Sequence, residues 1–301
     1  MQIGVAATPE VAIPTLDWLL ASEHTIDLII TQPDKPAGRG RVMTESVVSS
    51  WANNHGVAVV KPASSEELIG KIEDLDLVLT IGYGVLLPEK ILVLPKYGFL
   101  NLHFSLLPAY RGAAPAQRAL HKGELTTGVS VFQLDKGMDT GPIYSQESID
   151  ILPEWRSFEL LQQLAQLGPA TVSQAFDMIQ EGKAPTPQSG VASVAPKIDK
   201  AEAKINFDQT AVNIVNAIRA FTPEPGAWTT WKGESFKVTS ARISQEIKLS
   251  VGEIKAFENS VFVGTRDSAI ELLSVVPSGK KEMMAKDWAR GARLIGGELF
   301  G

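Results

Sequence analysis

Residues 98–120 read GFLNLHFSLLPAYRGAAPAQRAL, a pattern that predicts a buried strand, a proline-interrupted loop and then a helix. Within the apolar run, Asn101 and His103 are two positions apart, so in a strand both side chains point to the same face. A core strand normally excludes both residue types, because a buried polar group destabilises a fold unless it is hydrogen bonded. The stretch therefore predicts a polar site on a buried strand.

The chain before this stretch predicts a parallel sheet with helices. Residues 2–7, 27–32 and 76–84 are short apolar runs that predict strands, and residues 8–20 predict a helix between the first two. The order strand, helix, strand is typical of a doubly wound α/β sheet. The first turn reads AATPE rather than GxGxxG, so the dinucleotide-binding fingerprint is absent.

The chain after this stretch predicts a second domain. Residues 157–182 have apolar residues at helical spacing, and Gly168–Pro169 within them predicts a joint between two helices. Residues 183–205 are rich in Pro, Ser, Ala and Lys and predict a linker. From Pro223 onward, short β-like runs alternate with turn residues, which is typical of a small closed barrel.

The composition limits the possible function classes. The 301 residues are 44% hydrophobic and 21% charged, as in an ordinary globular protein of about two domains. The absence of cysteine excludes disulfides, thiolate metal sites and a cysteine nucleophile. No signal peptide and no apolar run of membrane-spanning length is evident, so we expect a cytoplasmic protein without membrane contact. With a net charge of −6, any nucleic acid has to bind local basic patches.

Asn101 and His103 suit acyl chemistry. An Asn amide donates to a carbonyl oxygen that becomes negative, and a His donates or accepts a proton near neutral pH. Asp139, in the glycine-flanked loop at residues 135–141, is the carboxylate expected to orient the imidazole at the carboxyl edge of a parallel sheet. Taken singly, His103 also fits a satisfied core histidine and Asp139 a turn-forming residue. The four histidines show no metal-ligand spacing, so no metal site is predicted.

The motif N-L-H-x-S-L-L-P-x-Y-R-G-A-A-P-x-Q-R-A at residues 101–119 resembles the signature of the 10-formyltetrahydrofolate-dependent formyltransferases. The segments at residues 112–119 and 31–40 (TQPDKPAGRG) resemble the branch that acts on methionyl-tRNA. The similarity continues through DKGMDTG (135–141) and PSGKKEM (277–283), and so covers essentially the whole chain.

The resemblance implies the fold, the reaction and the partners. It implies a Rossmann-like catalytic domain with a mainly parallel sheet at residues 1–182, a linker at 183–205 and an OB-like barrel that contacts tRNA at 206–301. The implied reaction moves the formyl group of 10-formyltetrahydrofolate to the methionine α-amino group of initiator methionyl-tRNA, releases tetrahydrofolate and needs no metal. A monomer is expected. The implied site residues are catalytic Asn101, His103 and Asp139, folate-binding Ser105, Leu106, Leu107, Pro108, Leu86 and Leu87, and tRNA-binding Lys35, Arg39 and Arg41.

Some alternatives stay open at this point. Arg111 either braces the loop at residues 105–108 or contacts substrate. Val42, Met43 and Thr44 stand where the family often has lysines, so tRNA affinity is expected to depend more on the barrel and on Lys280, Lys281 and Lys286. The same folate site could serve an amino-sugar nucleotide or water as acceptor. A non-catalytic RNA-binding protein is a further alternative, but it leaves Asn101, His103 and Asp139 without a role.

Overall fold

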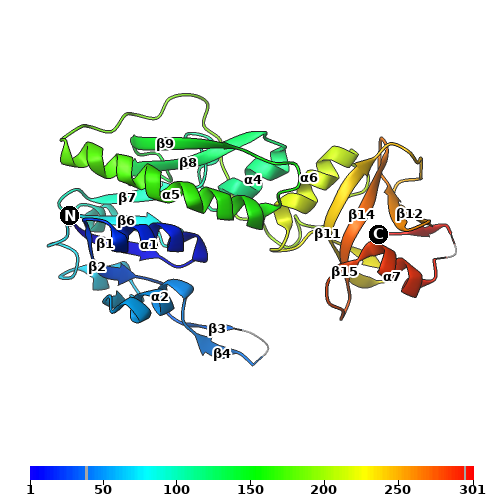
Figure 1. Cartoon of the computed structure of the whole chain (residues 1–301), viewed down its shortest axis with the longest axis horizontal. Coiled ribbons are helices and arrows are strands. Elements are labelled where there is room, and N and C mark those ends of the chain that lie inside the picture. The colour runs from blue at the N-terminus through cyan, green and yellow to red at the C-terminus, as the bar shows by residue number, and fades with distance from the viewer. Residues whose placement is uncertain (38–39, 295) are drawn as a thin grey trace. The chain divides into compact units, whose positions relative to one another are not determined.

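The computed structural model describes residues 1–37, 40–294 and 296–301, and the chain divides into two compact units (Figure 1). Unit 1 comprises residues 1–115, 126–150 and 161–196. Unit 2 comprises residues 116–125, 151–160 and 197–301. The units interleave along the chain, whereas the sequence predicts consecutive domains.

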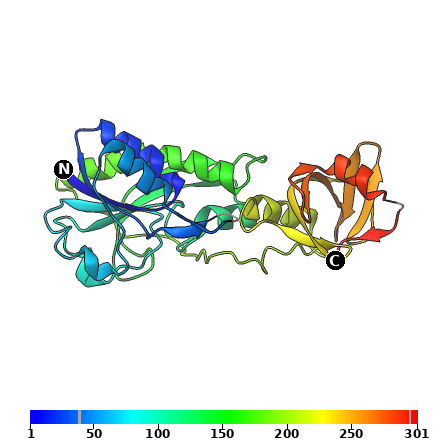
Figure 2. The same cartoon turned by 90° about the horizontal axis from the view of Figure 1, so that it is seen from below.

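Unit 1 contains a seven-stranded sheet in the order β5-β2-β1-β6-β7-β8-β9. The first five of these strands run parallel to one another, and β8 and β9 are antiparallel to their neighbours, so the predicted mainly parallel α/β sheet is confirmed. Helices α1 and α2 cover one face and α3 lies on the other (Figure 2). The elements are β1 Gln2–Ala7, α1 Ile13–Ala21, β2 Thr25–Ile30, β3 Lys35–Ala37, β4 Val42–Thr44, α2 Val47–His55, β5 Val59–Val60, β6 Leu77–Ile81, α3 Glu89–Leu92, β7 Phe99–His103, β8 Thr126–Gln133, β9 Ile143–Asp150 and α5 Ser157–Gln180, with short 3-10 helices at Glu10–Ala12 and Ser65–Leu68. Residues 157–160 of α5 belong to unit 2.

The pairing of β7 with β8 corrects one expectation. Strand β8 runs antiparallel to β7, with His103 opposite Ser130 and Leu100 opposite Gln133. The loop at residues 134–142 therefore starts near the amino end of β7, and not at the carboxyl edge of a parallel sheet. Only the expected direction of β8 was wrong, because hydrophobic patterning does not report strand direction, and mixed sheets with antiparallel edge strands are common. Asp139, further along the loop, still reaches His103 at the carboxyl end of β7.

The second correction concerns Gly168–Pro169, which lies inside one continuous helix, α5. A Cβ atom at Gly168 would lie 2.4 Å from Thr15 Oγ1 and 2.9 Å from Leu102 Cδ2. The glycine therefore allows α5 to pack closely on α1 and β7 and does not mark a joint. The proline removes one backbone donor from the helix without ending it.

Unit 2 contains an antiparallel sheet in the order β10-β11-β14-β13-β12-β16 that forms a nearly closed barrel (Figure 2). The Gly301 N–H donates to Thr230 O over 3.3 Å, which links the chain end to β10. Phe236, Trp288 and Phe300 pack together in its core. The predicted small barrel is thus confirmed. The elements are α4 Pro115–Lys122, α6 Ala211–Phe221, β10 Trp228–Trp231, β11 Glu234–Ser244, β12 Glu253–Phe257, β13 Ser260–Gly264, β14 Ala269–Pro277, β15 Met283–Met284, α7 Ala285–Ala292 and β16 Glu298–Leu299.

None of the helices in the described ranges is long and apolar enough to cross a membrane.

Three histidines make stability depend on pH. Burial is the largest cause that lowers the pKa of His24, His103 and His121 below the usual value. The unfolded chain then binds more protons than the folded one below about pH 6.5, where free histidine titrates. We therefore expect the urea concentration at the midpoint of unfolding to decrease when the pH is lowered from 7.5 to 5.5. A midpoint that is equal or higher at pH 5.5 would contradict this expectation.

Candidate active site

A cavity of about 440 Å³ lies in unit 1, beside the carboxyl ends of β6 and β7. Asn101 and His103 line it from β7, which fits two side chains that share one face of a strand. Asp139 lines it from the loop at residues 134–142. Leu86 and Leu87 line it from the loop that follows β6. The structure therefore brings five of the predicted site residues together around one cavity.

The environment of His103 fixes which nitrogen faces the site. The ring is buried, with 6% of its side chain exposed, and Nε2 lies 3.0 Å from Tyr110 O. A carbonyl oxygen only accepts hydrogen bonds, so Nε2 carries a proton in either charge state. Nδ1 is then the nitrogen that gains or loses a proton, and it lies 3.8 Å from Asp139 Oδ2. Burial lowers the pKa of His103, and the Asp139 carboxylate opposes this shift.

The Asp139 carboxylate does not make the side-chain hydrogen bonds that stabilise the turn of its loop. That part is taken by Asp135, whose Oδ1 accepts hydrogen bonds from Gly137 N at 2.9 Å and Thr140 Oγ1 at 2.7 Å. Asp139 instead accepts a hydrogen bond from Gly112 N through Oδ2 at 2.7 Å. Its backbone has φ of 54°, a left-handed conformation that is uncommon outside glycine. The loop thus directs this carboxylate toward the cavity.

The remaining cavity wall is largely apolar. Tyr83, Leu92, Phe104, Leu134 and Met138 line it together with the two predicted leucines. The sequence prediction missed these five residues, because an apolar side chain in a core segment gives no signal that it borders a cavity. An apolar wall beside a few polar groups suits a flat organic ligand.

Two family models match the chain. The "Formyl transferase" model matches residues 4–176, and the "Formyl transferase, C-terminal domain" model matches residues 197–293. The chain belongs to the formyl transferase family.

Relatives of this formyl transferase include a methionyl-tRNA formyltransferase from Streptomyces griseus that is 42% identical and covers 100% of both chains. Among solved structures, a methionyl-tRNA formyltransferase from Clostridium thermocellum matches 82% of this chain and 95% of its own, with a TM-score of 0.58 and 17% identity. An N-formyltransferase from Helicobacter canadensis, in complex with folinic acid and dTDP-3-aminofucose, matches 93% of this chain and 99% of its own, with a TM-score of 0.67 and 19% identity. Both structures support the fold.

The loop at residues 105–108 of this formyl transferase does not line the cavity. Ser105 and Leu107 are buried, and the Ser130 hydroxyl from β8 holds the loop between them. It donates to Ser105 O at 2.6 Å and accepts from Leu107 N at 3.0 Å and from Gln146 Nε2 at 2.8 Å. The prediction that Ser105, Leu106, Leu107 and Pro108 contact folate stays a prediction.

We expect Ser130→Ala to lower the free energy of unfolding by about 2 kcal/mol, because it leaves buried partners of the hydroxyl without their hydrogen bond. Urea denaturation would measure the change. Ser148→Ala on β9 is the matched control, because Ser148 is exposed. We expect the control to change stability by less than about 0.5 kcal/mol. Equal effects of the two substitutions would contradict the expectation.

The predicted tRNA-binding residues lie on or beside a hairpin in unit 1. Lys35 belongs to β3 and Arg41 precedes β4, and both are exposed. The sequence predicts a loop here, whereas β3 and β4 pair antiparallel. Arg39 lies outside the described residues. Lys280, Lys281 and Lys286 are exposed on unit 2.

Residues 183–196, which we call the strap, run along unit 1, although the sequence predicts part of a linker there. Thr186 exchanges backbone hydrogen bonds of 2.7 and 2.8 Å with Ile143, and Arg111 N donates to Ser193 O at 2.9 Å. Proline-rich, aperiodic segments give no sequence signal for such isolated bridges, so the prediction missed them.

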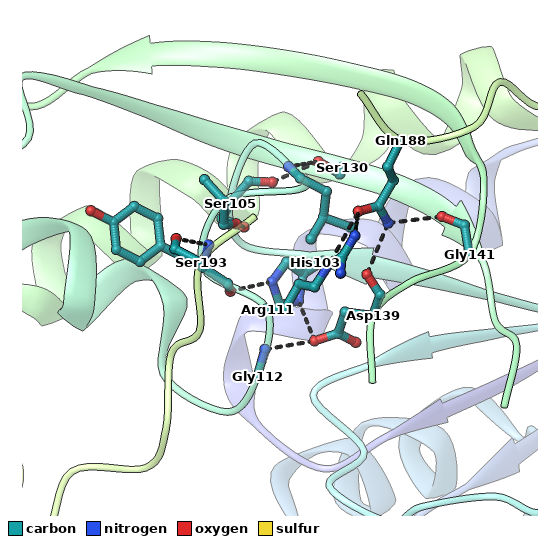
Figure 3. A network of polar contacts seen from close by, with 12 residues as sticks. His103, Ser105, Arg111, Gly112, Ser130, Asp139, Gly141, Gln188 and Ser193 are labelled. Carbon is teal, nitrogen blue, oxygen red and sulfur yellow. Dashed lines mark hydrogen bonds and ion pairs between the residues drawn. The ribbon is translucent and has the colours of Figure 1, made fainter. Parts of the chain in front are cut away.

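One strap residue reaches the active site. The Gln188 amide bonds to the loop that carries Asp139 and also to the Arg111 side chain (Figure 3). Arg111 therefore uses its guanidinium to bind the strap. The alternative in which Arg111 braces residues 105–108 finds no support in the hydrogen bonds of the guanidinium, which go to Gln188.

Within the described ranges, no group of three or more His, Asp or Glu side chains is arranged to hold a metal ion.

Proposed function

We propose that this formyl transferase moves the formyl group of 10-formyltetrahydrofolate to the α-amino group of methionine on initiator methionyl-tRNA. The observation that carries the proposal is the 42% identity, over the full length of both chains, to an enzyme named for this substrate. The cavity with Asn101, His103 and Asp139 supports formyl transfer at this position. The products are N-formylmethionyl-tRNA and tetrahydrofolate.

The side chains suggest a division of roles. The Asn101 amide and the protonated Nδ1 of His103 donate hydrogen bonds to the formyl oxygen, which becomes negative when the amine attacks the formyl carbon. The Asp139 carboxylate, 3.8 Å from Nδ1, stabilises the imidazolium. Asp139, through His103 or a water molecule, then removes the proton of the attacking amine. The bond between the formyl carbon and N10 breaks, and N10 takes up the proton as tetrahydrofolate leaves. These residue roles are part of the proposal.

The cavity fits a folate. Leu87 is buried and Leu86 is 82% exposed, so this pair forms an apolar wall that extends toward the cavity opening. Phe104 and Leu92 add apolar surface against which a flat ring system packs. The loop at residues 105–108 lies outside this cavity, and we propose that it contacts folate on the resemblance alone.

The tRNA is proposed to contact Lys35, Arg39 and Arg41 near the hairpin, and the barrel at residues 206–301. We propose residues 1–182 as the catalytic domain and residues 183–205 as the connection. A cytoplasmic monomer fits this activity.

Removing cations from the hairpin should weaken tRNA binding. We expect the double variant Lys35→Ala/Arg41→Ala to bind methionyl-tRNA more weakly, and the slope of log K against log salt to fall by about one per lost phosphate contact. Filter binding over a range of salt concentrations measures both. The control is Lys71→Ala, an exposed lysine elsewhere in unit 1. Unchanged affinity of the double variant would remove the hairpin from the proposed interface.

The function is tested with radiolabelled 10-formyltetrahydrofolate offered to methionyl-tRNA, free methionine, an amino-sugar nucleotide or buffer alone. We expect the label on methionyl-tRNA only. Label on the amino sugar would favour the alternative that the Helicobacter canadensis enzyme illustrates. Formate release in buffer would indicate a hydrolase. Binding of tRNA without any transfer would indicate a non-catalytic RNA-binding protein.

A further inference from the structure

We propose that Gln188 of the strap is a positioning residue, which holds the loop that carries Asp139 at the distance from His103 that formyl transfer needs. The inference rests on the proposed roles of His103 and Asp139. It adds a residue from a segment that the sequence predicts to be a linker.

The Gln188 amide forms hydrogen bonds to the loop that carries Asp139 on one side and to the Arg111 side chain on the other. Its Nε2 donates to Asp139 O and to Gly141 O, each over 2.8 Å. Its Oε1 accepts from Arg111 Nε at 3.2 Å and from Arg111 Nη2 at 2.6 Å. Carbonyl oxygens only accept and a guanidinium only donates, so the amide has one orientation that satisfies both sides (Figure 3). A carboxylate lacks the two donors, and an ammonium lacks the acceptor.

Backbone hydrogen bonds anchor the strap both before and after Gln188 in the chain. Thr186, two residues earlier, is paired with Ile143 through two backbone hydrogen bonds. Ser193 and Ala195, further along, bond to the backbone of Arg111 at 2.9 and 2.6 Å. The anchors therefore hold the amide against the loop while its flanking residues Pro187 and Ser189 stay exposed.

The loop needs such a support at Asp139. Its backbone has φ of 54°, a left-handed conformation that is unfavourable for a residue other than glycine. Gly112 N holds the carboxylate at Oδ2, and Gln188 holds the main-chain carbonyl of the same residue. Without Gln188, the loop loses one of the two bonds that fix Asp139, together with the bond to Gly141.

The effect reaches His103 through charge. Its imidazole is buried, and the Asp139 carboxylate at 3.8 Å favours the protonated ring. Asp135 and Tyr83 are the other titratable groups that line the same cavity, and the Arg111 guanidinium is bonded to Gln188. Gln188 is uncharged, so its replacement by an uncharged residue changes the field at His103 only by moving these groups.

Gln188→Met is the test, because methionine has a similar length but no amide. We expect an NMR titration of the imidazoles in the full chain, with His103 assigned by comparison with His103→Gln, to show its midpoint at lower pH. The midpoint of His24 should stay where it is. In steady-state assays we expect kcat to fall about tenfold or more, because small displacements of reacting groups are costly, with KM little changed. Ser189→Ala should leave both readouts unchanged.

An unchanged His103 midpoint in a folded Gln188→Met variant overturns the proposal, whatever the activity. If the unchanged chain transfers no formyl group, the proposed function fails, and the titration still decides whether Gln188 positions Asp139. If Gln188→Met loses the folded spectrum, Gln188→Asn takes its place. The shorter amide of asparagine cannot reach both the loop and Arg111, so we again expect the His103 midpoint at lower pH. An unchanged His103 midpoint in this variant also overturns the proposal.

Discussion

His103→Ala and Asn101→Ala should each lower turnover by roughly 10²–10³-fold, the usual effect of losing one donor to a developing oxyanion. Both side chains line the cavity from the same strand. Nδ1 of His103 faces Asp139, whereas Nε2 is taken by Tyr110 O, so the imidazole has one nitrogen available for chemistry. The assay is single-turnover formyl transfer at saturating folate and methionyl-tRNA.

The control for this prediction is His55→Ala, which removes an exposed histidine at the end of α2. We expect it to keep normal turnover. Circular dichroism and thermal unfolding would show that the His103 and Asn101 variants keep the fold. Near-normal turnover of either folded variant would remove that residue from the proposed oxyanion site.

Gly141→Ala should lower the free energy of unfolding by about 3 kcal/mol, the upper range for an overpacked site. A Cβ atom at Gly141 would lie 1.8 Å from Gln133 O, a backbone atom at the end of β8 that cannot move without disturbing the sheet. In a unit of this size, the change corresponds to a fall in Tm of roughly 6–12 °C. Turnover should fall as well, because Gly141 follows Asp139 by two residues and its carbonyl accepts from Gln188.

Gly291→Ala is the matched control for the steric argument. Gly291 lies in α7, and a Cβ atom there meets nothing within 4 Å. Alanine has a higher helix propensity than glycine, so we expect the free energy of unfolding to rise by about 0.5–1 kcal/mol. Calorimetry of both variants compares the two effects. Similar changes in Tm for Gly141→Ala and Gly291→Ala would show that the close approach at Gly141 is absent in solution.

Much of the fold can be predicted from the sequence, because the patterns that indicate strands and helices are local. Residues 76–84 form a continuous apolar run, and strand β6 there is buried on every residue. The β-like runs after Pro223 became the barrel strands. Gly168–Pro169 misled the prediction, because a glycine required for close packing looks the same in sequence as a glycine that ends a helix.

The candidate site was predictable where residue type itself is unusual. Asn101 and His103 interrupt a core strand, and Asp139 sits between glycines, so each carries a local signal. Gln188 carries none, because an amide in a polar, proline-rich segment is ordinary. Its importance depends on the side chain and backbone groups that surround it.

The sequence by itself determined the family, the presence of a mainly parallel α/β sheet followed by a small β-barrel, and the residue types available for formyl transfer. Only the tertiary structure decided the direction of β8, the route of the strap and the single nitrogen of His103 that faces Asp139. The physical reason is that periodicity and composition report how each segment meets solvent or the core. Strand direction and long-range hydrogen bonds depend on groups that are distant in the chain, such as Gln188 and Asp139, and are fixed only when the chain folds.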